Sequence, residues 1–245
     1  MDELTLDQSR ARGSRGVRVR IIQEWLTLHG HAVVADGDFG AATEEAVRRF
    51  QQRGGLRPDG VVGKKTYAAL VAPMTAALAR LEPGRKSLGA LVASYAQQHL
   101  RSRPREVGGE NAGPWVRLYM NGNEGSDWAW CAGFACFVLK QACDTLGIPL
   151  PIRPSVSCDS LASSARERGR FVGENERAAS ADLGAGSLFL NRRTSTDWVH
   201  TGIVLAFREE VFETIEGNTN DAGSREGYEV CRRVRGYPAK DFVVI

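Results

Sequence analysis

One stretch near the middle of the chain, residues 121–139, constrains the fold more than any other. It opens with a polar, glycine-rich loop at residues 121–127, passes through Trp128 and Trp130, and continues as a nearly unbroken apolar run. Apolar residues at helical spacing without a wide polar face predict a helix that is buried on most sides. Cys131 falls in the first turn, where unpaired backbone N–H groups and the helix dipole favour a thiolate. The pattern therefore makes Cys131 a candidate nucleophile.

Cysteine also occurs in protein interiors simply as a small apolar residue. We interpret Cys136 and Cys143, which lie further along the same predicted helix, in this way. Cys131 differs from them because it lies where loop becomes helix, after polar and aromatic residues. On this segment alone, both interpretations of Cys131 stay open.

The composition limits the class of protein. With 245 residues, 42% of them hydrophobic and 25% charged, the chain suits a globular protein of two domains, or of one domain with an appendage. A net charge of +3 and a pI near 8.7 suit an anionic polymer or surface, but are too weak to predict nucleic-acid binding. Five cysteines without a C-x-x-C pair and four scattered histidines predict free thiols and no zinc site. We expect neither a metal nor an organic cofactor.

The N-terminal residues lack the features of a secretory signal. Residues 1–12 contain no apolar core and no small-residue cleavage site, so we expect no signal peptide and synthesis in the cytoplasm. No stretch approaches the roughly 18 apolar residues that a membrane span requires. Residues 1–15 are rich in Arg, Ser and Gly and are predicted to form a disordered lead-in.

A short motif occurs twice in the N-terminal part. Its form is Asp-Gly-x-apolar-Gly-x-x-Thr followed by a helical pattern, once from Asp36 and again, 23 residues later, from Asp59. We expect a turn that needs glycine torsion angles, with the threonine capping the next helix. Another helix is predicted at residues 17–28, ended by Gly30. A calcium loop at Asp36 and Asp38 is disfavoured, because further oxygen ligands and a closing glutamate are missing.

With this repeat, residues 16–72 resemble the small three-helix peptidoglycan-binding domain found at one end of many bacterial and phage cell-wall hydrolases. Residues 56–60, between the copies, are part of the resemblance. It implies an all-α domain whose partner is bacterial peptidoglycan. The alternative is a domain that serves only as a scaffold, because spacing alone does not identify residues that would touch the wall.

A second domain is predicted over residues 88–245, after a linker at residues 73–87. The linker holds an Ala/Leu-rich helical piece that ends at Pro83 and Gly84, a strong helix-breaking pair. Helical patterns follow at residues 88–100 and 131–142, and again, after a proline-rich loop, at residues 161–168. Short β-rich runs come next, at residues 187–190, 200–207, 211–216 and 242–245. Helices first and strands afterwards indicate an α+β domain without an alternating parallel sheet.

Two of the predicted strands carry polar residues at neighbouring ends. His200 starts one strand, Glu216 and Asn218 end the next, and residues 208–210 form a turn short enough for a hairpin. Pairing centred near residue 208 or 209 would place His200 opposite Glu216 or Asn218, whereas a slip of one residue would turn both away. A histidine beside a carboxylate and an amide is what a cysteine nucleophile requires. The plain alternatives are a solvated histidine and an ordinary turn.

Taken together, these segments resemble the CHAP family of papain-like amidases and peptidases that cut peptidoglycan. The resemblance rests on residues 130–134 (Trp-Cys-Ala-Gly-Phe), 200–204 (His-Thr-Gly-Ile-Val) and 216–219 (Glu-Gly-Asn-Thr), within residues 88–245. It implies a papain-like domain in which a helix that begins with the cysteine packs on a small antiparallel sheet. It also implies Cys131 as nucleophile, His200 as general base and acid, Glu216 as orienting carboxylate and Asn218 as supporting amide. Whether Glu216 or Asn218 orients His200 stays open.

The two resemblances imply a two-domain peptidoglycan hydrolase, an amidase or an endopeptidase. The binding domain precedes the catalytic one, which favours a phage or prophage endolysin that acts on the wall, in the periplasm, after release. An antibacterial effector with a cognate immunity protein is the alternative setting for the same chemistry.

Two alternatives belong to other classes of protein. One is a non-catalytic cell-wall-binding protein whose papain-like domain is only structural, and the other is an acyltransferase or transpeptidase with the same triad. The sequence leaves open whether the bond cut joins muramic acid to L-alanine or lies within the peptides. We expect a monomer.

Overall fold

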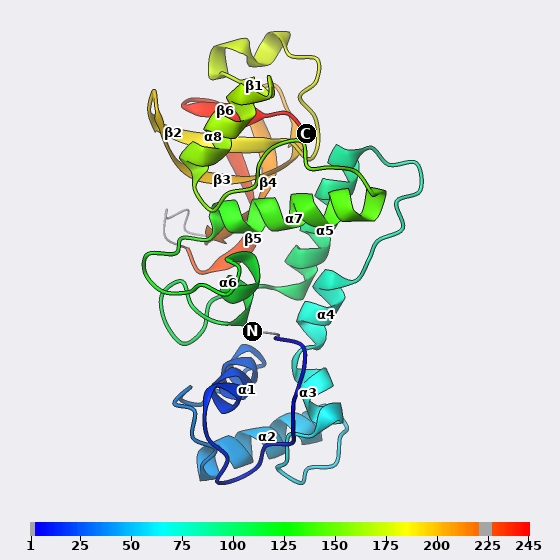
Figure 1. The fold of residues 1–245 in the computed structure, drawn as a ribbon, viewed down its shortest axis with the longest axis vertical. Helices are drawn as coiled ribbons and strands as arrows, with labels where there is room; N and C mark the ends of the chain where they lie inside the picture. Colours follow the sequence, from blue (N-terminus) through cyan, green and yellow to red (C-terminus); the bar gives the residue numbers. More distant parts are fainter. Residues whose placement is uncertain (1–2, 221–226) are drawn as a thin grey trace. The chain divides into compact units, whose positions relative to one another are not determined.

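The structure is a computed structural model, and it describes residues 3–220 and 227–245, apart from the side chains of residues 178 and 179. The chain divides into two compact units, each built from two stretches of sequence (Figure 1). Unit 1 comprises residues 1–78 and 105–127, and unit 2 comprises residues 79–104 and 128–245. The fold is mixed α+β, as predicted.

Unit 1 is helical within its described residues. Its helices are α1 (Val17–Leu28), α2 (Ala41–Arg53), α3 (Lys64–Leu70), α4 (Ala72–Leu78) and α6 (Pro114–Tyr119). The helix predicted at residues 17–28 is present, and α2 and α3 each follow one copy of the repeat, as expected for a three-helix domain. Buried apolar side chains of α1, α2 and α3 form the core, among them Ile21, Ile22, Trp25, Val47 and Leu70.

The second copy of the repeat folds around a buried glutamine, Gln51. Its Nε2 donates hydrogen bonds to Asp59 Oδ1 at 2.9 Å and to Thr66 Oγ1 at 3.1 Å, and its Oε1 accepts one from the Gly60 N–H at 2.9 Å. Gly60 has a φ of 76°, a conformation that glycine adopts at little cost. The side chain of Gln51 thus takes up the polar groups that the tight turn would otherwise leave buried and unpaired.

The first copy repeats this arrangement around Gln23, which hydrogen bonds with Asp36, Gly37 and Thr43. Gly37 has a φ of 77°, so the glycine turn predicted from the sequence is present in both copies. The predicted threonine cap is wrong. In each copy the N-cap residue of the following helix is a glycine without a side-chain cap, and the threonine lies in the first turn, where it bonds with the glutamine.

The sequence predicts a disordered lead-in over residues 1–15, yet its described part, residues 3–15, packs on unit 1. Arg10 pairs with Val62 in an antiparallel bridge. The side chain of Glu3 is buried, and its backbone carbonyl accepts a hydrogen bond from Tyr67 Oη at 2.8 Å. These contacts reach residues more than 50 positions away. The local composition of the lead-in therefore gave no sign of them.

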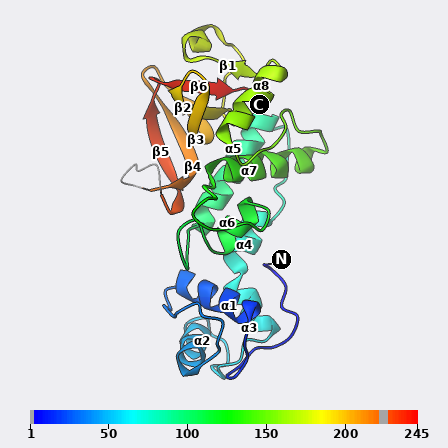
Figure 2. The ribbon, with the colours of Figure 1, turned by 60° about the vertical axis from the view of Figure 1, so that its left-hand side comes forward.

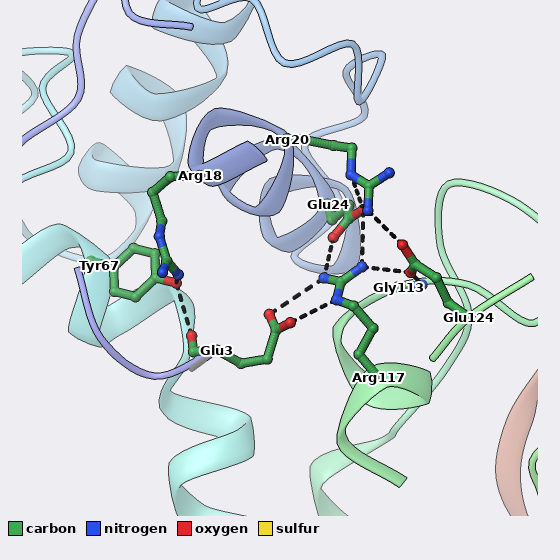
Figure 3. A network of polar contacts seen from close by, with 8 residues as sticks. All are labelled: Glu3, Arg18, Arg20, Glu24, Tyr67, Gly113, Arg117 and Glu124. Carbon is green, nitrogen blue, oxygen red and sulfur yellow. Dashed lines mark hydrogen bonds and ion pairs between the residues drawn. The ribbon is translucent and has the colours of Figure 1, made fainter. Parts of the chain in front are cut away.

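Residues 105–127, which the sequence assigns to the second domain, belong to unit 1. Arg117 of α6 is only 8% exposed and lies at the centre of an ionic cluster (Figure 3). Its partners are the carboxylates of Glu3, Glu24 and Glu124, each with an N···O distance of 2.6 Å. Glu24 belongs to α1 and Glu3 to the N-terminal stretch, so one arginine ties three separate parts of the sequence together. The pKa of Arg117 is raised despite burial, because these carboxylates stabilise its charge.

Unit 2 contains a six-stranded antiparallel sheet with the order β1-β6-β2-β3-β4-β5. The strands are β1 (Phe171–Val172), β2 (Leu188–Thr194), β3 (Asp197–Phe207), β4 (Val211–Thr219), β5 (Glu229–Gly236) and β6 (Lys240–Val243). The hairpin predicted across residues 208–210 is confirmed, since Phe207 pairs with Phe212 and Ile203 with Ile215. The edge strands β1 and β5 were not predicted, and β5 contributes to the site described below.

Three α-helices and a 3₁₀ helix accompany the sheet: α5 (Leu88–Ser102), α7 (Cys131–Leu146), α8 (Cys158–Glu167) and η1 (Glu174–Ala179). Helix α7 packs against β3, β4 and α5, and α8 packs against β3 (Figure 2). Helix α8 begins three residues earlier than predicted, because Ser157 caps it by accepting a hydrogen bond from the Ser160 N–H. Among the described residues, no helix combines the length and apolarity needed to cross a membrane.

An aromatic cluster holds the strands of unit 2 together. It comprises Phe189, Val204, Phe212, Tyr237 and Phe242. The rings of Phe212 and Phe242 lie with their centroids 5.3 Å apart in an edge-to-face arrangement, which aromatic pairs favour. Because its members come from β2, β3, β4 and β6, with Tyr237 just beyond β5, the cluster fixes the strands that position the polar residues below.

Candidate active site

Cys131 is the first residue of α7, as the sequence predicts. The helix begins there because the Trp130 carbonyl accepts the first helical hydrogen bond, from the Phe134 N–H, and the apolar run that follows is buried. Cys131 is itself only 4% exposed. Its Sγ lies 3.9 Å from Sγ of Cys158, the first residue of α8. The start of α7 thus places a sulfur atom at the positive end of a 16-residue helix.

His200 of β3 is linked to Arg235 of β5 through Glu216, which lies on the strand between them. Its Nε2 lies 2.8 Å from Glu216 Oε2 on β4, which leaves Nδ1 as the ring nitrogen available to Cys131. Arg235 of β5 in turn donates two hydrogen bonds to Glu216, from Nε to Oε1 at 2.9 Å and from Nη2 to Oε2 at 2.6 Å. This paired geometry between arginine and carboxylate is strong and directional. The result is a continuous polar chain from Cys131 through His200 and Glu216 to Arg235.

The pKa values of these groups follow from this arrangement. The pKa of Cys131 is lowered, first of all by the hydrogen bond with Cys158. Burial acts in the opposite direction, but the charge of His200 and a hydrogen bond with the Thr201 N–H lower the pKa further. Burial alone would lower the pKa of His200, but the Cys131 thiolate and Glu216 raise it to about 9. Both shifts favour a thiolate on Cys131 beside a protonated His200, which is the reactive state of a cysteine nucleophile.

Glu216 stays ionised although it is completely buried. Burial alone would raise its pKa, but the hydrogen bonds from Arg235 and His200, together with their charges, lower the pKa to about 2. The carboxylate is therefore available to hold the His200 ring in place and to stabilise its positive charge.

Two glycines allow the close packing of these elements. A Cβ on Gly202 would lie 2.6 Å from Glu216 Cγ and 2.9 Å from Phe189 Cε1. A Cβ on Gly217 would lie 2.8 Å from atoms of both Trp130 and Phe134, at the start of α7. Any larger residue at Gly217 would push the start of α7 away from β4, and any larger residue at Gly202 would displace the side chain of Glu216.

The structure brings together three of the four predicted site residues through direct contacts. His200 bonds with Glu216, and not with Asn218. Asn218 lies in the left-handed region with a φ of 52° and is only 3% exposed. Its Oδ1 is buried without a hydrogen-bond partner among the described residues. Asn218 is thus close to the site in sequence, while the contact that orients the imidazole comes from Glu216.

Sequence reasoning missed Arg235 and Cys158. Arg235 lies on β5, which was not predicted as a strand, because residues 230–235 (Val-Cys-Arg-Arg-Val-Arg) show no regular alternation of apolar and charged residues. Cys158 lies in a stretch that offers no recognisable motif. To predict the contact of Arg235 with Glu216, the pairing register of β4 and β5 would have been needed. To predict the contact of Cys158 with Cys131, the position of α8 would have been needed.

Within residues 3–220 and 227–245, no group of three or more His, Cys, Asp or Glu side chains is arranged to hold a metal ion. The carboxylate of Asp36, considered above as a calcium ligand, accepts hydrogen bonds from Gln23 and from the Asp38 N–H.

The N-terminal part of the chain matches a known family. A family described as "Putative peptidoglycan binding domain" matches residues 15–70. No curated protein is similar enough to this chain to be counted as a relative.

Three solved structures share sequence similarity with parts of the chain. The N-terminal domain of SleB is 38% identical over 27% of this chain and 93% of that one, with a TM-score of 0.27. An L,D-transpeptidase from Xylanimonas cellulosilytica is 44% identical over 28% of this chain and 34% of its own, with a TM-score of 0.25. The endolysin of the Burkholderia AP3 phage is 30% identical over 38% of this chain and 33% of its own, with a TM-score of 0.27. The chain spans about a third of the length of the last two. The family match is thus confined to residues 15–70, which are similar to a peptidoglycan-binding domain.

Proposed function

We propose that the chain is a peptidoglycan hydrolase that cleaves an amide bond with Cys131 as nucleophile. The observation that supports this most directly is the polar chain in unit 2, in which a buried carboxylate orients His200 beside a cysteine at a helix N-terminus. A peptidoglycan-binding domain in the same chain indicates the polymer that would supply the amide. The resemblance of residues 88–245 to CHAP amidases and peptidases agrees with both observations.

The mechanism we propose begins with attack of the Cys131 thiolate on the amide carbonyl carbon. The oxygen of the tetrahedral intermediate would be stabilised by the backbone N–H of Cys131 at the start of α7. The His200 imidazolium then donates its proton to the leaving amine, the C–N bond breaks and a thioester forms. Neutral His200 next takes a proton from water, which attacks the thioester and releases a free acid. Glu216 keeps the imidazole in one tautomer throughout.

Arg235 would act as a positioning residue in this scheme. Its two hydrogen bonds hold both oxygens of Glu216, and its charge keeps that carboxylate ionised. Arg235 touches neither the sulfur nor, in our proposal, the substrate. It would therefore influence the reaction only through Glu216.

The setting we propose is that of a phage or prophage lysin, because the wall-binding domain precedes the catalytic one. The substrate bond would be either the amide between muramic acid and L-alanine or a peptide bond of the stem or cross-bridge. Cleavage at the first would release intact stem peptides, whereas cleavage at the second would release shorter peptides.

The decisive test compares the wild-type chain with Cys131→Ala on purified peptidoglycan, followed by turbidity and by mass analysis of the soluble fraction. We expect the wild type to release fragments and the variant to release none, since the variant lacks the sulfur that attacks the carbonyl carbon. Cys143→Ala is the matched control, a buried cysteine three turns further along α7, and should retain activity. Fragment release by Cys131→Ala would refute the mechanism. If neither protein acts while both sediment with the wall, the chain is a binding protein.

A further inference from the structure

The two cysteines nearest to the proposed site lie at the starts of two different helices. Sγ of Cys131 in α7 and Sγ of Cys158 in α8 are 3.9 Å apart, although 27 positions separate them in the sequence. Both side chains are buried, with exposed fractions of 4% and 8%. Both thiols are free. The fold has thus brought a second thiol into direct contact with the candidate nucleophile.

Helix α8 is anchored so that this contact is maintained. Asp159, the residue after Cys158, accepts a hydrogen bond through Oδ1 from the Trp198 N–H at 2.7 Å. Trp198 lies on β3, two residues before His200. The strand that carries the histidine therefore also fixes the first turn of α8 and the sulfur of Cys158.

The two sulfurs differ in charge. The hydrogen bond with Cys158 and the charge of His200 lower the pKa of Cys131, which favours the thiolate on Cys131 and makes Cys158 the donor between the two sulfurs. The neighbouring thiolate, together with burial and the charge of Asp159, raises the pKa of Cys158, so this residue keeps its proton. A reactive thiolate with a protonated thiol in contact is the arrangement of a peroxide-sensitive cysteine and its resolving partner.

We propose that Cys131 and Cys158 form a reversible disulfide that blocks the nucleophile. The regulatory meaning of this bond rests on the proposed function, whereas the bond itself follows from the sulfur geometry alone. A disulfide requires a sulfur separation of about 2.05 Å, so the two atoms must approach by about 2 Å. Rotation of the Cys131 side chain about χ1 can carry its sulfur toward Cys158, while the hydrogen bond between Asp159 and Trp198 keeps the first turn of α8 in place.

The oxidant is a peroxide. The Cys131 thiolate attacks one peroxide oxygen, the O–O bond breaks, and the departing hydroxide takes the proton of His200 to give water, which leaves Cys131 as a sulfenic acid. Cys158 then passes its proton to neutral His200, and its thiolate attacks Cys131 Sγ. The S–O bond breaks, and the second hydroxide takes the proton back from His200. Two thiols and one hydrogen peroxide thus give one disulfide and two waters.

Cys136 supplies an internal comparison. It lies on α7 and is buried like Cys131, but its sulfur bonds with the backbone of Ser155, and burial raises its pKa to about 11. Cys136 should therefore remain a thiol under conditions that oxidise Cys131. Replacing it by serine should leave the formation of the pair unchanged.

The experiment uses the full chain, treated with a small excess of hydrogen peroxide, alkylated and digested without reductant. We expect mass analysis to find the peptides of Cys131 and Cys158 linked, with loss of two hydrogen atoms, and separated again by dithiothreitol. Cys158→Ser keeps a hydrogen-bond donor but cannot form the bond, so Cys131 should accumulate as sulfenic acid, trapped by dimedone, and then as sulfinic acid. Cys136→Ser should behave like the wild type.

A parallel arm measures release of peptidoglycan fragments. Peroxide should abolish release by the wild type and dithiothreitol should restore it, whereas the loss in Cys158→Ser should become irreversible. Linked peptides in a chain that never releases fragments would sustain the disulfide and refute the proposed function. Fragment release together with Cys131 sulfinic acid and no linked peptides in the wild type would refute the disulfide and sustain the function.

Discussion

Glu216 is the residue on which the proposed site depends most. Both of its oxygens are fully engaged, since Oε1 accepts from Thr214 Oγ1 at 2.6 Å and from Arg235, and Oε2 bonds with His200 and Arg235. A buried carboxylate without such partners would take up a proton at neutral pH. The four contacts therefore do more than orient His200, because they also preserve the charge that raises its pKa.

This coupling predicts the alkaline limit of activity. Hydrolysis by the wild type should decline as pH rises through about 9, because His200 loses the proton that the leaving amine needs. Glu216→Gln removes a negative charge that raises the pKa of His200, so the alkaline limb should move to lower pH as the rate falls. The measurement is the rate of fragment release from peptidoglycan against pH.

Glu213→Gln is the matched control for this change. Glu213 lies on the same strand, and its partner is Arg208 rather than a site residue. Its pH profile should coincide with that of the wild type. An unshifted alkaline limb in Glu216→Gln would contradict the role assigned to the carboxylate.

Single residues of the site could be predicted where a local pattern reveals their surroundings. Cys131 was predicted from the junction of a polar loop with an apolar helix, and His200 and Glu216 from a short hairpin turn. Arg235 could not be predicted, because its partner is set by the pairing of β4 with β5. Cys158 could not be predicted either, since only the packing of α8 on β3 brings it to Cys131.

At the scale of elements, the packing of α7 on β4 positions the sulfur. Gly217 lies between Glu216 and Asn218, and its Cα faces Trp130 and Phe134 with no space for a methyl group. Gly217→Ala should therefore destabilise unit 2 by about 1 to 3 kcal/mol, the usual cost of overpacking a core. It should also reduce the rate of hydrolysis, because the start of α7 must move. Urea unfolding and fragment release test the two effects.

Gly184→Ala is a suitable comparison for this substitution. Gly184 belongs to unit 2, and a Cβ there would meet no atom within 4 Å. Its unfolding midpoint should stay close to that of the wild type. Equal stability of the Gly217 and Gly184 variants would show that α7 can move away from β4 without cost.

Some helices and strands could be predicted from the sequence and others could not, for a physical reason. Helix α7 and the hairpin of β3 and β4 have strong local signals, an apolar run in one case and two β-rich runs around a short polar turn in the other. Strand β1 contains only two residues, and the three arginines of β5 (Arg232, Arg233 and Arg235) interrupt the alternation of apolar and polar residues that indicates a strand. Their formation depends on neighbouring strands that supply hydrogen-bond partners.

At the scale of the molecule, Arg117 connects the two stretches of unit 1. Arg117→Met should lower the free energy of unfolding of this unit by about 3 to 5 kcal/mol, because three carboxylates would remain in the cluster without their central cation. Hydrogen exchange followed by mass spectrometry should show faster exchange in α1 and α6 and unchanged exchange in α7.

Arg49→Met provides the control for that prediction. Arg49 pairs with Glu45 one turn away on α2, and both side chains are largely exposed, so their loss should change stability little. If Arg117→Met left the protection of α1 and α6 intact, the ionic cluster would not be what holds residues 105–127 to unit 1.

The organisation of the whole molecule was the least predictable from the sequence. The change from unit 1 to unit 2 after residue 78 falls within the predicted linker, where Pro83 and Gly84 give a local signal. The return of residues 105–127 to unit 1 gives no such signal, since it depends on contacts of Arg117 with residues more than 90 positions earlier.

The path of the chain has a practical consequence for anyone who would recombine its parts. The polypeptide passes between the units after residues 78, 104 and 127, and the last passage comes only three residues before Cys131. A gene cut at residue 78 would leave Glu3 and Glu24 in the shortened piece and their counter-ion in the other. A chimera that exchanges the binding domain would thus also have to exchange residues 105–127, which lie as an insert within the sequence of unit 2.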